Sequence, residues 1–366
     1  MRFVVFGLTI SSSWGNGHAT IWRGLVRALA RCGAHVVFFE RDLPYYAANR
    51  DMTEMAGGDL VLYPDWAEVA PRAVSETASA DVAIVTSYCP DAVAATDLLS
   101  EAQTPLRVFY DLDTPVTLSR LGGGEDVGYI GPRGLRDFDL VLSFTGGNAL
   151  AELRQRLGAR RVAPLYGHVD PEVHRPTQPV AHYAADLSYL GTYAGDRQAA
   201  LQSLFIAPAA LRPERRFLIG GAQYPQSFPW SPNIFFVRHL PPGEHAAFFS
   251  SSRITLNVTR AAMARMGWCP SGRLFEAAGC GTVVLSDCWE GLSAFYTEGS
   301  EVLVARSTEE ATAVLDLSDA EINRIGKAAR ERTLAEHTSE RRADQLLQIV
   351  TEARRQPIPT CEEDAA

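Results

Sequence analysis

The residues around position 276 combine groups that could hold a phosphate and a ribose. Ser271, Gly272 and Arg273 open a segment of helical character, and the acidic Glu276 follows about one turn later. A helix N-terminus concentrates unpaired backbone N–H groups and positive dipole, which suits a phosphate. A carboxylate one turn deeper could accept hydrogen bonds from both hydroxyls of a ribose. The pattern therefore predicts a bound nucleotide and, with the rest of the chain, a nucleotide-sugar.

Other roles for Glu276 are weaker. A capping box that starts at Ser271 would place its acid at position 274, where the chain has leucine. An ordinary solvated glutamate is the remaining alternative, although the adjacent Phe275 and Ala277 have the character of buried residues. Binding to the ribose is the interpretation that we favour for this carboxylate.

The elements that must position these residues alternate between short apolar runs and amphipathic segments. In the first half, apolar runs lie at 3–8, 35–39, 60–63, 82–86, 106–110, 140–144 and 162–165. Between the first two of these runs, Ile21, Leu25 and Leu29 recur every fourth residue, as on a helix face. This alternation predicts a parallel sheet covered by helices on both faces, with sites at the carboxyl ends of its strands.

A polar, proline-bearing stretch at 167–176 interrupts the alternation, which then restarts with runs at 187–190, 216–219, 234–237, 254–258 and 283–285. The sequence therefore predicts an α/β protein of two Rossmann-like domains facing across a cleft, the GT-B architecture. The predicted domains are 1–170, which would bind the acceptor, and 180–338, which would bind the nucleotide-sugar. A polar helix at 339–355 is expected to cross back to the first domain, and a disordered tail is expected at 356–366.

A series of short motifs in the second half carries a family resemblance: Ser271-x-Arg273-x-x-Glu276-Ala277-x-x-Cys280-Gly281, Ser286-Asp287, Glu298-Gly299-x-Glu301-Val302, Gly326, Arg332 and Glu336-His337. In order and spacing, they resemble glycosyltransferases of the spore-maturation CgeB type, relatives of the retaining group-4 glycosyltransferases. The resemblance covers about residues 250–348. One departure is Trp268, because the retaining relatives place a second glutamate at that position.

Arg273 and Arg197 are candidates for the diphosphate of the donor. Expelling a nucleoside diphosphate requires fixed positive charge, and related enzymes without a metal supply it from the first turn of the second domain. Arg197 is the only cation of that turn, where Gly191 and Thr192 could bring backbone close to phosphate. The alternatives are a structural salt bridge for Arg273 and pairing with Asp196 for Arg197.

The first strand is followed by a glycine-bearing turn, Gly15-Asn16-Gly17-His18, which we expect beside the acceptor. Inverting relatives of this fold place a catalytic histidine in a similar loop, with an orienting aspartate roughly a hundred residues later. Asp111 and Asp113 end a predicted strand at about that separation. A histidine base steered by Asp113 could deprotonate a hydroxyl. Simple capping or substrate binding by His18, and a turn role for Asp113, stay open as alternatives.

Composition limits the function classes. The chain has 366 residues, 21% of them charged, and a net charge of −9, which argues against a nucleic-acid partner. Its six cysteines include no C-x-x-C pair, so thiols in the cytoplasm are the expectation. No window of about 18 apolar residues could span a membrane, and a peripheral membrane contact stays open. Asp111-x-Asp113 resembles a metal motif, but we expect no metal and no cofactor in this architecture.

The sequence thus predicts a cytoplasmic glycosyltransferase that moves a sugar from a nucleoside-diphosphate sugar to a hydroxyl of an acceptor: a small molecule, a glycan or a protein. A nucleotide-sugar epimerase of the same fold and a non-catalytic nucleotide-sugar-binding protein of surface assembly are the alternatives. The donor base, the sugar, the acceptor and the oligomeric state are not encoded in recognisable motifs. The stereochemistry is also open, because the resemblance favours retention and the His18–Asp113 spacing favours inversion.

Overall fold

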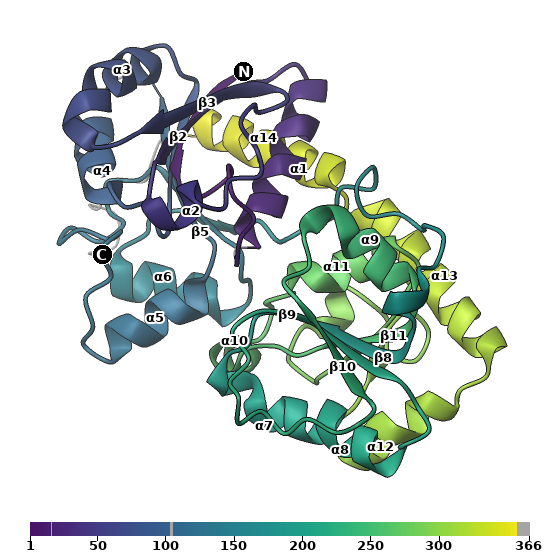
Figure 1. Cartoon of the computed structure of the whole chain (residues 1–366). Helices are drawn as coiled ribbons and strands as arrows, with labels where there is room; N and C mark the ends of the chain where they lie inside the picture. Colours follow the sequence, from purple (N-terminus) through teal and green to yellow (C-terminus); the bar gives the residue numbers. More distant parts are fainter. Residues whose placement is uncertain (16, 103–104, 357–366) are drawn as a thin grey trace. The chain divides into compact units, whose positions relative to one another are not determined.

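The computed structural model describes residues 1–15, 17–102 and 105–356, which form two compact α/β units (Figure 1). The first unit comprises residues 1–166 and the chain from Glu340 on, and the second comprises Gly167–Ser339. The second unit therefore begins inside the segment predicted as a linker. Val169 explains this early start, because its N–H donates to the His337 carbonyl at 3.0 Å and ties the segment to the end of the second unit.

The first unit is built on a seven-stranded, wholly parallel sheet with the order β3-β2-β1-β4-β5-β6-β7. The strands are β1 (Arg2–Gly7), β2 (His35–Arg41), β3 (Gly58–Tyr63), β4 (Val82–Thr86), β5 (Leu106–Asp111), β6 (Leu140–Ser143) and β7 (Val162–Pro164). Each lies where the sequence predicts an apolar run. The strand order reverses between β1 and β4, and ligands of such sheets bind beyond the carboxyl ends of the strands at that point.

The helices of the first unit connect these strands. They are α1 (His18–Arg31), α2 (Pro44–Ala47), α3 (Trp66–Ala78), α4 (Ala92–Glu101), α5 (Thr114–Gly122) and α6 (Asn148–Leu157), joined by the C-terminal α14 (Ser339–Arg355). The predicted crossing of the last helix is confirmed, because α14 packs on the first unit. Arg161 Nη1 donates to the Ala353 carbonyl at 2.9 Å, and Gln345 Nε2 donates to the Pro164 carbonyl at 3.3 Å.

The second unit repeats the same topology with six parallel strands in the order β10-β9-β8-β11-β12-β13. They are β8 (Ala185–Leu190), β9 (Phe217–Gly221), β10 (Ile234–Arg238), β11 (Ser252–Asn257), β12 (Val283–Ser286) and β13 (Leu303–Val304). The order now reverses between β8 and β11. The sequence does not predict β13, since two residues are too few to show a pattern.

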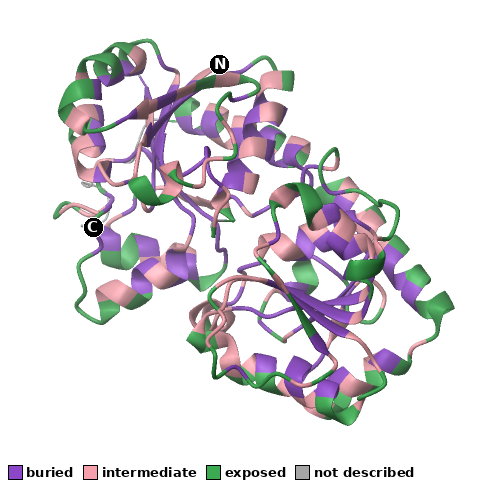
Figure 2. Ribbon diagram, viewed as in Figure 1, coloured by how far each residue is buried: buried purple, intermediate pink, exposed green. Residues whose placement is uncertain are grey.

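The α-helices of the second unit are α7 (Gln198–Leu201), α8 (Ala207–Leu211), α9 (Pro242–Ser250), α10 (Ala261–Met266), α11 (Gly272–Gly279), α12 (Thr308–Ala313) and α13 (Asp319–Glu336). Short 3₁₀ turns lie at Ala181–Tyr183, Gly195–Arg197, Leu292–Ala294 and Val314–Asp316, with a π-helical turn at Gln202–Ile206. The inner strands form the buried centre of each unit, whereas edge strands such as β10 are partly exposed (Figure 2). The predicted class, two parallel-sheet α/β domains, is confirmed. No helix within the described ranges is both long enough and apolar enough to cross a membrane.

Candidate functional site

Helix α11 begins as the sequence predicts. Ser271 is its N-cap, and the Ser271 hydroxyl accepts a hydrogen bond from the Arg273 N–H at 3.3 Å. The helix buries Leu274, Phe275, Ala277 and Ala278 and leaves the Glu276 side chain only partly covered. The Glu276 carboxylate lies back over the first turn, since a Cβ placed on Gly272 would be 3.8 Å from Glu276 Oε1. The Glu276 carboxylate and the N-terminus of α11 therefore lie close together.

Arg273 extends from α11 to the point where the strand order reverses. Its Nε donates to the carbonyl of Leu190, the last residue of β8, and its Nη1 donates to Asn257 Oδ1, at the end of β11, at 3.1 Å. The guanidinium lies 5.0 Å from the centroid of the Tyr189 ring. None of the described residues forms an ion pair with Arg273, so the salt-bridge alternative finds no support. Burial lowers the pKa of this guanidinium.

Arg197 supplies a second positive charge in the same place. Its Nη1 donates to the Thr192 carbonyl at 3.3 Å, and its Nε is buried with no hydrogen-bond partner among the described residues. Asp196 pairs with Arg260 at 3.2 Å instead, so the predicted alternative partner of Arg197 is engaged elsewhere. After burial, the positive charge of Arg197 also contributes to the lowered pKa of Arg273. Two adjacent cations without a carboxylate between them favour an anionic ligand.

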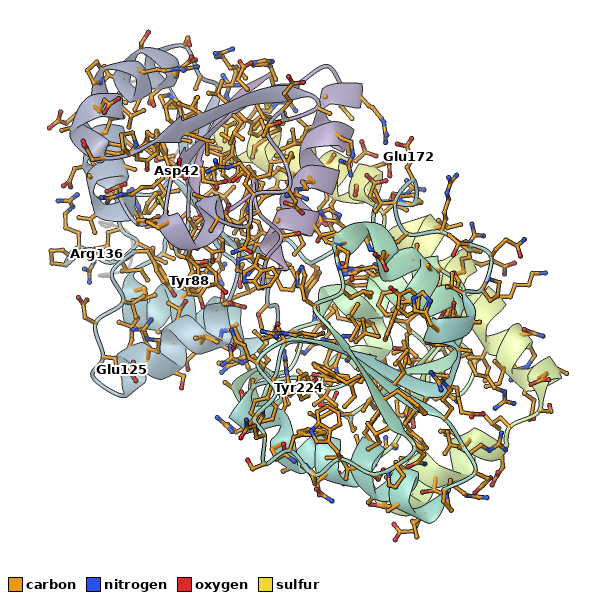
Figure 3. The ribbon with its side chains drawn as sticks, viewed as in Figure 1. Asp42, Tyr88, Glu125, Arg136, Glu172 and Tyr224 are labelled. Carbon is orange, nitrogen blue, oxygen red and sulfur yellow. The ribbon has the colours of Figure 1, made fainter. Side chains whose placement is uncertain are left out.

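Two tyrosines complete this cationic corner, and the sequence analysis does not identify either. The Tyr224 hydroxyl donates to the Gly191 carbonyl at 3.1 Å (Figure 3). The Tyr189 hydroxyl is buried and has no hydrogen-bond partner among the described residues. A Cβ on Gly191 would lie 2.9 Å from both Arg273 Nη2 and the Tyr189 oxygen, so this corner requires glycine. Tyr189 lies inside a predicted strand, where its pattern is that of a core residue.

The Glu276 carboxylate accepts no hydrogen bond from any residue that the structure describes. Burial raises the pKa of Glu276, while the charges of His245 and Arg273 act in the opposite direction. His245 and His174 lie beside it, and one ligand atom from each of the three side chains falls within 4.8 Å of the others. Neither histidine is a sequence candidate, because nothing in their local patterns relates positions 174, 245 and 276.

In the first unit, the structure brings His18 and Asp113 together. His18 Nε2 lies 3.8 Å from Asp113 Oδ2, and the two side chains are 19% and 20% exposed. His18 is the first residue of α1, and Asp113 is the N-cap of α5, so both lie at the carboxyl edge of the sheet. Burial lowers the pKa of His18, and the negative charge of Asp113 opposes that shift. A histidine held neutral beside a carboxylate can accept a proton.

Tyr88 is a third member of this group that the sequence does not predict. It follows β4 in a left-handed backbone conformation with φ 64° (Figure 3), and the negative charge of Asp113 acts on its hydroxyl. The Tyr88 ring centroid lies 5.9 Å from that of His18. Burial raises the pKa of Tyr88. The tyrosine therefore packs against the imidazole and interacts electrostatically with Asp113.

Asp111 is fully buried, at 0% exposure, and holds the turn that carries Asp113. Its Oδ1 accepts from the Asp113 N–H and the Thr117 hydroxyl, both at 3.1 Å. Its Oδ2 has no hydrogen-bond partner among the described residues. Burial raises the pKa of Asp111 to about 7. The predicted contact between Asp111 and an acceptor stays a prediction, and the contacts present serve the turn.

Glu40, which the sequence does not predict as a site residue, anchors the loop that precedes His18. Glu40, at 1% exposure near the end of β2, accepts from the backbone N–H groups of Ile10 and Ser11 at 2.7 and 3.0 Å. The hydroxyls of Thr9 and Ser11 donate to the same carboxylate. An acid at the end of an otherwise apolar run is the signal that could have revealed it.

The glycines of this loop lie at its exposed end. Gly15 has φ 61°, which favours glycine, and a Cβ on Gly17 would meet nothing within 4 Å. Both residues are exposed, so their backbone is open to a ligand. Asn16, which we also predict beside the acceptor, lies outside the described residues.

Comparisons with known proteins agree with the fold. Residues 197–348 match a family model described as "Glycosyl transferase-like". No curated protein matches the chain. Among solved structures, sucrose-phosphate synthase from Thermosynechococcus elongatus is 15% identical with a TM-score of 0.69, and the alignment covers 97% of this chain and 99% of that one.

Two further structures have similar scores. HepE from Anabaena, in complex with UDP-glucose, is 11% identical with a TM-score of 0.67, covering 96% of this chain and 100% of that one. An alpha-glucosyltransferase in complex with UDP is 13% identical with a TM-score of 0.67 and the same coverage of both chains. The fold is therefore that of the GT-B glycosyltransferases. The family match covers less than half of the chain, but it includes Arg197, Arg273 and Glu276.

Proposed function

We propose that this protein is a glycosyltransferase that transfers a sugar from a nucleoside-diphosphate sugar, held by the second unit, to a hydroxyl of an acceptor held by the first. One observation carries the proposal. Arg197 and Arg273, which form no ion pair with a described residue, place two guanidiniums at the strand-order reversal of the second unit, near the partly covered carboxylate of Glu276. A nucleoside diphosphate has the complementary groups, namely two phosphates and a ribose diol.

On the donor side, departure of the nucleoside diphosphate leaves negative charge on its phosphate oxygens. Arg197 and Arg273 are fixed by backbone and side-chain acceptors before the reaction, so they stabilise this charge without reorganising. The helix α11 N-terminus adds its N–H groups and dipole. Glu276 accepts hydrogen bonds from the ribose hydroxyls and thereby sets the position of the diphosphate relative to the two arginines.

On the acceptor side, His18 is the candidate general base. A neutral imidazole removes the proton from the acceptor hydroxyl as that oxygen attacks the anomeric carbon. The Asp113 carboxylate stabilises the imidazolium that forms, and the Tyr88 ring packs against the imidazole. Trp268 stands where the retaining relatives have a glutamate, which removes one acidic group from the donor-sugar side and supports a mechanism that relies on His18.

The finer assignments belong to the same proposal. The motifs of the second unit support a CgeB-type transferase. The double-Rossmann architecture supports transfer without a metal, and six scattered cysteines with no C-x-x-C pair support a cytoplasmic location. A peripheral membrane contact is part of the same proposal. The acceptor is a small molecule, a glycan or a protein. One similar structure is an alpha-glucosyltransferase in complex with UDP-glucose and DNA containing an abasic site. The net charge of −9 supports a different acceptor for this chain.

Calorimetry of nucleoside diphosphates binding to the Glu276→Ala variant, with a chelator present, tests the donor site. Uridine diphosphate is the first ligand to try. Loss of charge-assisted hydrogen bonds worth about 2–3 kcal/mol predicts affinity weaker by roughly 30- to 150-fold. Glu331→Ala is the matched control, since the Glu331 side chain is 67% exposed on α13. Equal affinity of the Glu276→Ala variant and the wild type would refute the assignment.

Transfer is tested separately from binding. Donor sugars are incubated with the protein, with and without candidate acceptors, and separated by chromatography. A transferase consumes the donor in step with a glycosylated acceptor, and the anomeric NMR signal of the product then gives the stereochemistry. A change of the free nucleotide-sugar without acceptor indicates an epimerase. Binding without hydrolysis or transfer across the acceptor panel indicates a non-catalytic role.

A further inference from the structure

Two histidines that the proposed transfer does not use lie against Glu276. His174 belongs to the segment that opens the second unit, His245 lies on α9 and Glu276 lies on α11. One ligand atom from each of the three side chains lies within 4.8 Å of the other two. The imidazole rings are 6.0 Å apart and inclined by 45°. Three separate elements of one compact unit therefore direct two nitrogens and a carboxylate oxygen to one point.

His245 has the arrangement that metal-binding histidines show. Its Nε2 lies 3.3 Å from the Leu240 carbonyl, to which it can donate a hydrogen bond. That bond assigns the proton to Nε2 and leaves the lone pair on Nδ1, and Nδ1 is buried with no hydrogen-bond partner among the described residues. Histidine ligands of metals generally donate their other N–H to a carbonyl or carboxylate in this way.

The other two groups complete a recognisable donor set. His174 is 1% exposed, and the Glu276 carboxylate accepts no hydrogen bond from a described residue. Two imidazoles and one carboxylate are a set that binds Zn²⁺, with a fourth position open to water or another ligand. A tetrahedral ion at ~2.0–2.2 Å from each ligand places ligand atoms about 3.4 Å apart. Ligand atoms that now lie within 4.8 Å of one another must therefore move closer together when the ion binds.

Sulfur is not part of this set. Among the described residues, the ligand atoms that lie within 4.8 Å of one another come from two histidines and one glutamate, and none of them is a sulfur. The site is therefore one of nitrogen and oxygen donors.

We propose that His174, His245 and Glu276 form a binding site for Zn²⁺ or a similar transition-metal dication. We further infer that the ion and the donor nucleotide compete, a clause that rests on the proposed function because it gives Glu276 to the ribose. A carboxylate that coordinates a dication has fewer lone pairs for the two ribose hydroxyls. The metal is an inhibitor of donor binding in this proposal and takes no part in the transfer.

Zinc binding to the metal-free full-length protein, measured by calorimetry, tests the site. His245→Phe removes both ring nitrogens but keeps an aromatic ring next to Phe249, whose ring centroid lies 6.4 Å from that of His245. Loss of a direct ligand predicts affinity weaker by more than about 100-fold, beyond the 10–100-fold typical of an outer-shell partner. His182→Phe is the control, because His182 is an exposed histidine of the same unit. Unchanged zinc affinity in the His245→Phe variant overturns the proposal.

Cobalt provides an independent readout. Co²⁺ at this site should give the visible absorption of a tetrahedral nitrogen–oxygen complex, without the near-ultraviolet band of a thiolate ligand. Glu276→Gln, which keeps the shape of the side chain and removes its charge, should abolish that spectrum even if His245→Phe folds poorly. A thiolate band, or a spectrum that persists in Glu276→Gln, would assign the ion to another place and overturn the proposal.

Competition is measured last, so that the two proposals fail separately. Calorimetry with a chelator shows whether the nucleoside diphosphate binds at all, and this arm tests only the proposed function. If it binds, saturating zinc should weaken its affinity at least 10-fold in the wild type and leave that of His245→Phe unchanged. Nucleotide affinity that ignores zinc in the wild type refutes the competition, whatever the zinc affinity is.

Discussion

Replacing Asp111 by asparagine should change how the stability of the first unit depends on pH. The folded protein raises the pKa of this carboxyl from 3.8 to about 7 because it is buried. Between those values the folded state holds a proton that the unfolded chain has lost. Rising pH therefore removes stability from the wild type across that window. The Asp111→Asn variant has no proton to lose at this position and should not show this loss.

The magnitude follows from the shift. About three pKa units at 1.36 kcal/mol each give a total of ~4 kcal/mol, of which roughly 2–3 kcal/mol falls between about pH 5 and pH 8. The asparagine oxygen can accept the same two hydrogen bonds from Asp113 and Thr117. Its NH₂ group takes the place of Oδ2, which has no described partner, at a pH-independent cost of about 1–3 kcal/mol. The pH dependence of the difference in unfolding free energy between the variant and the wild type is therefore better defined than that difference at any single pH.

Hydrogen exchange measured by mass spectrometry gives this quantity for one unit at a time. The slowest amides of β5 report the opening free energy of the first unit, after correction for the intrinsic pH dependence of exchange. From about pH 5 to pH 8, the Asp111→Asn variant should gain roughly 2–3 kcal/mol relative to the wild type. Asp126→Asn is the control, since Asp126 is exposed. Parallel pH profiles of Asp111→Asn and the wild type would refute the argument that burial of this carboxyl costs stability.

Three further predictions concern the candidate nucleotide site of the second unit and the residues around His18 in the first unit. Gly191→Ala puts a methyl group 2.9 Å from Arg273 Nη2 and should weaken nucleoside-diphosphate binding more than about 10-fold by calorimetry, whereas Gly195→Ala, whose Cβ meets nothing within 4 Å, should not. Glu40→Gln turns an NH₂ group toward the donors of the loop before α1 and should therefore lower the thermal midpoint of unfolding by several degrees. The control is Glu54→Gln, because Glu54 is exposed. A midpoint equal to that of the wild type would contradict the anchoring role of Glu40. For transfer, kcat/KM should rise with pH with an apparent pKa below 6.5, because burial lowers the pKa of His18; Asp113→Asn, which removes the opposing charge, should lower that apparent pKa further, and a profile that moves to higher pH would count against His18 as the base.

Most of the fold could be predicted because buried parallel strands leave a strong local signal. Runs such as 82–86 are apolar at every position, since both faces of the strand are covered. Such runs indicate their own secondary structure without knowledge of the rest of the chain. The two-residue β13 and the early start of the second unit escape prediction for the opposite reason. Both depend on contacts with distant segments, such as the one between Val169 and His337.

The same distinction between local and long-range patterns separates the site residues that the sequence predicts from those that it does not. Ser271, Arg273 and Glu276 lie within one helical turn and a half, so their spacing alone indicates that they act together. His18 and Asp113 are found because both follow predicted strands of one sheet and because inverting relatives of the fold place a histidine and an aspartate at a similar separation. Tyr88 also follows such a strand, but an aromatic residue there has a core role as its ordinary explanation.

The histidines beside Glu276 show what this kind of sequence argument lacks. Spacing along a helix relates residues three or four positions apart, and strand order relates residues at the ends of strands. His174, in an irregular segment, and His245, in the middle of α9, belong to neither pattern. They meet Glu276 only because α9 packs against α11 and because the opening segment of the second unit covers both. Glu276 is the site residue that the sequence identifies most readily, as a ligand of the ribose. Its proposed second role, binding zinc together with two histidines, cannot be predicted from the sequence.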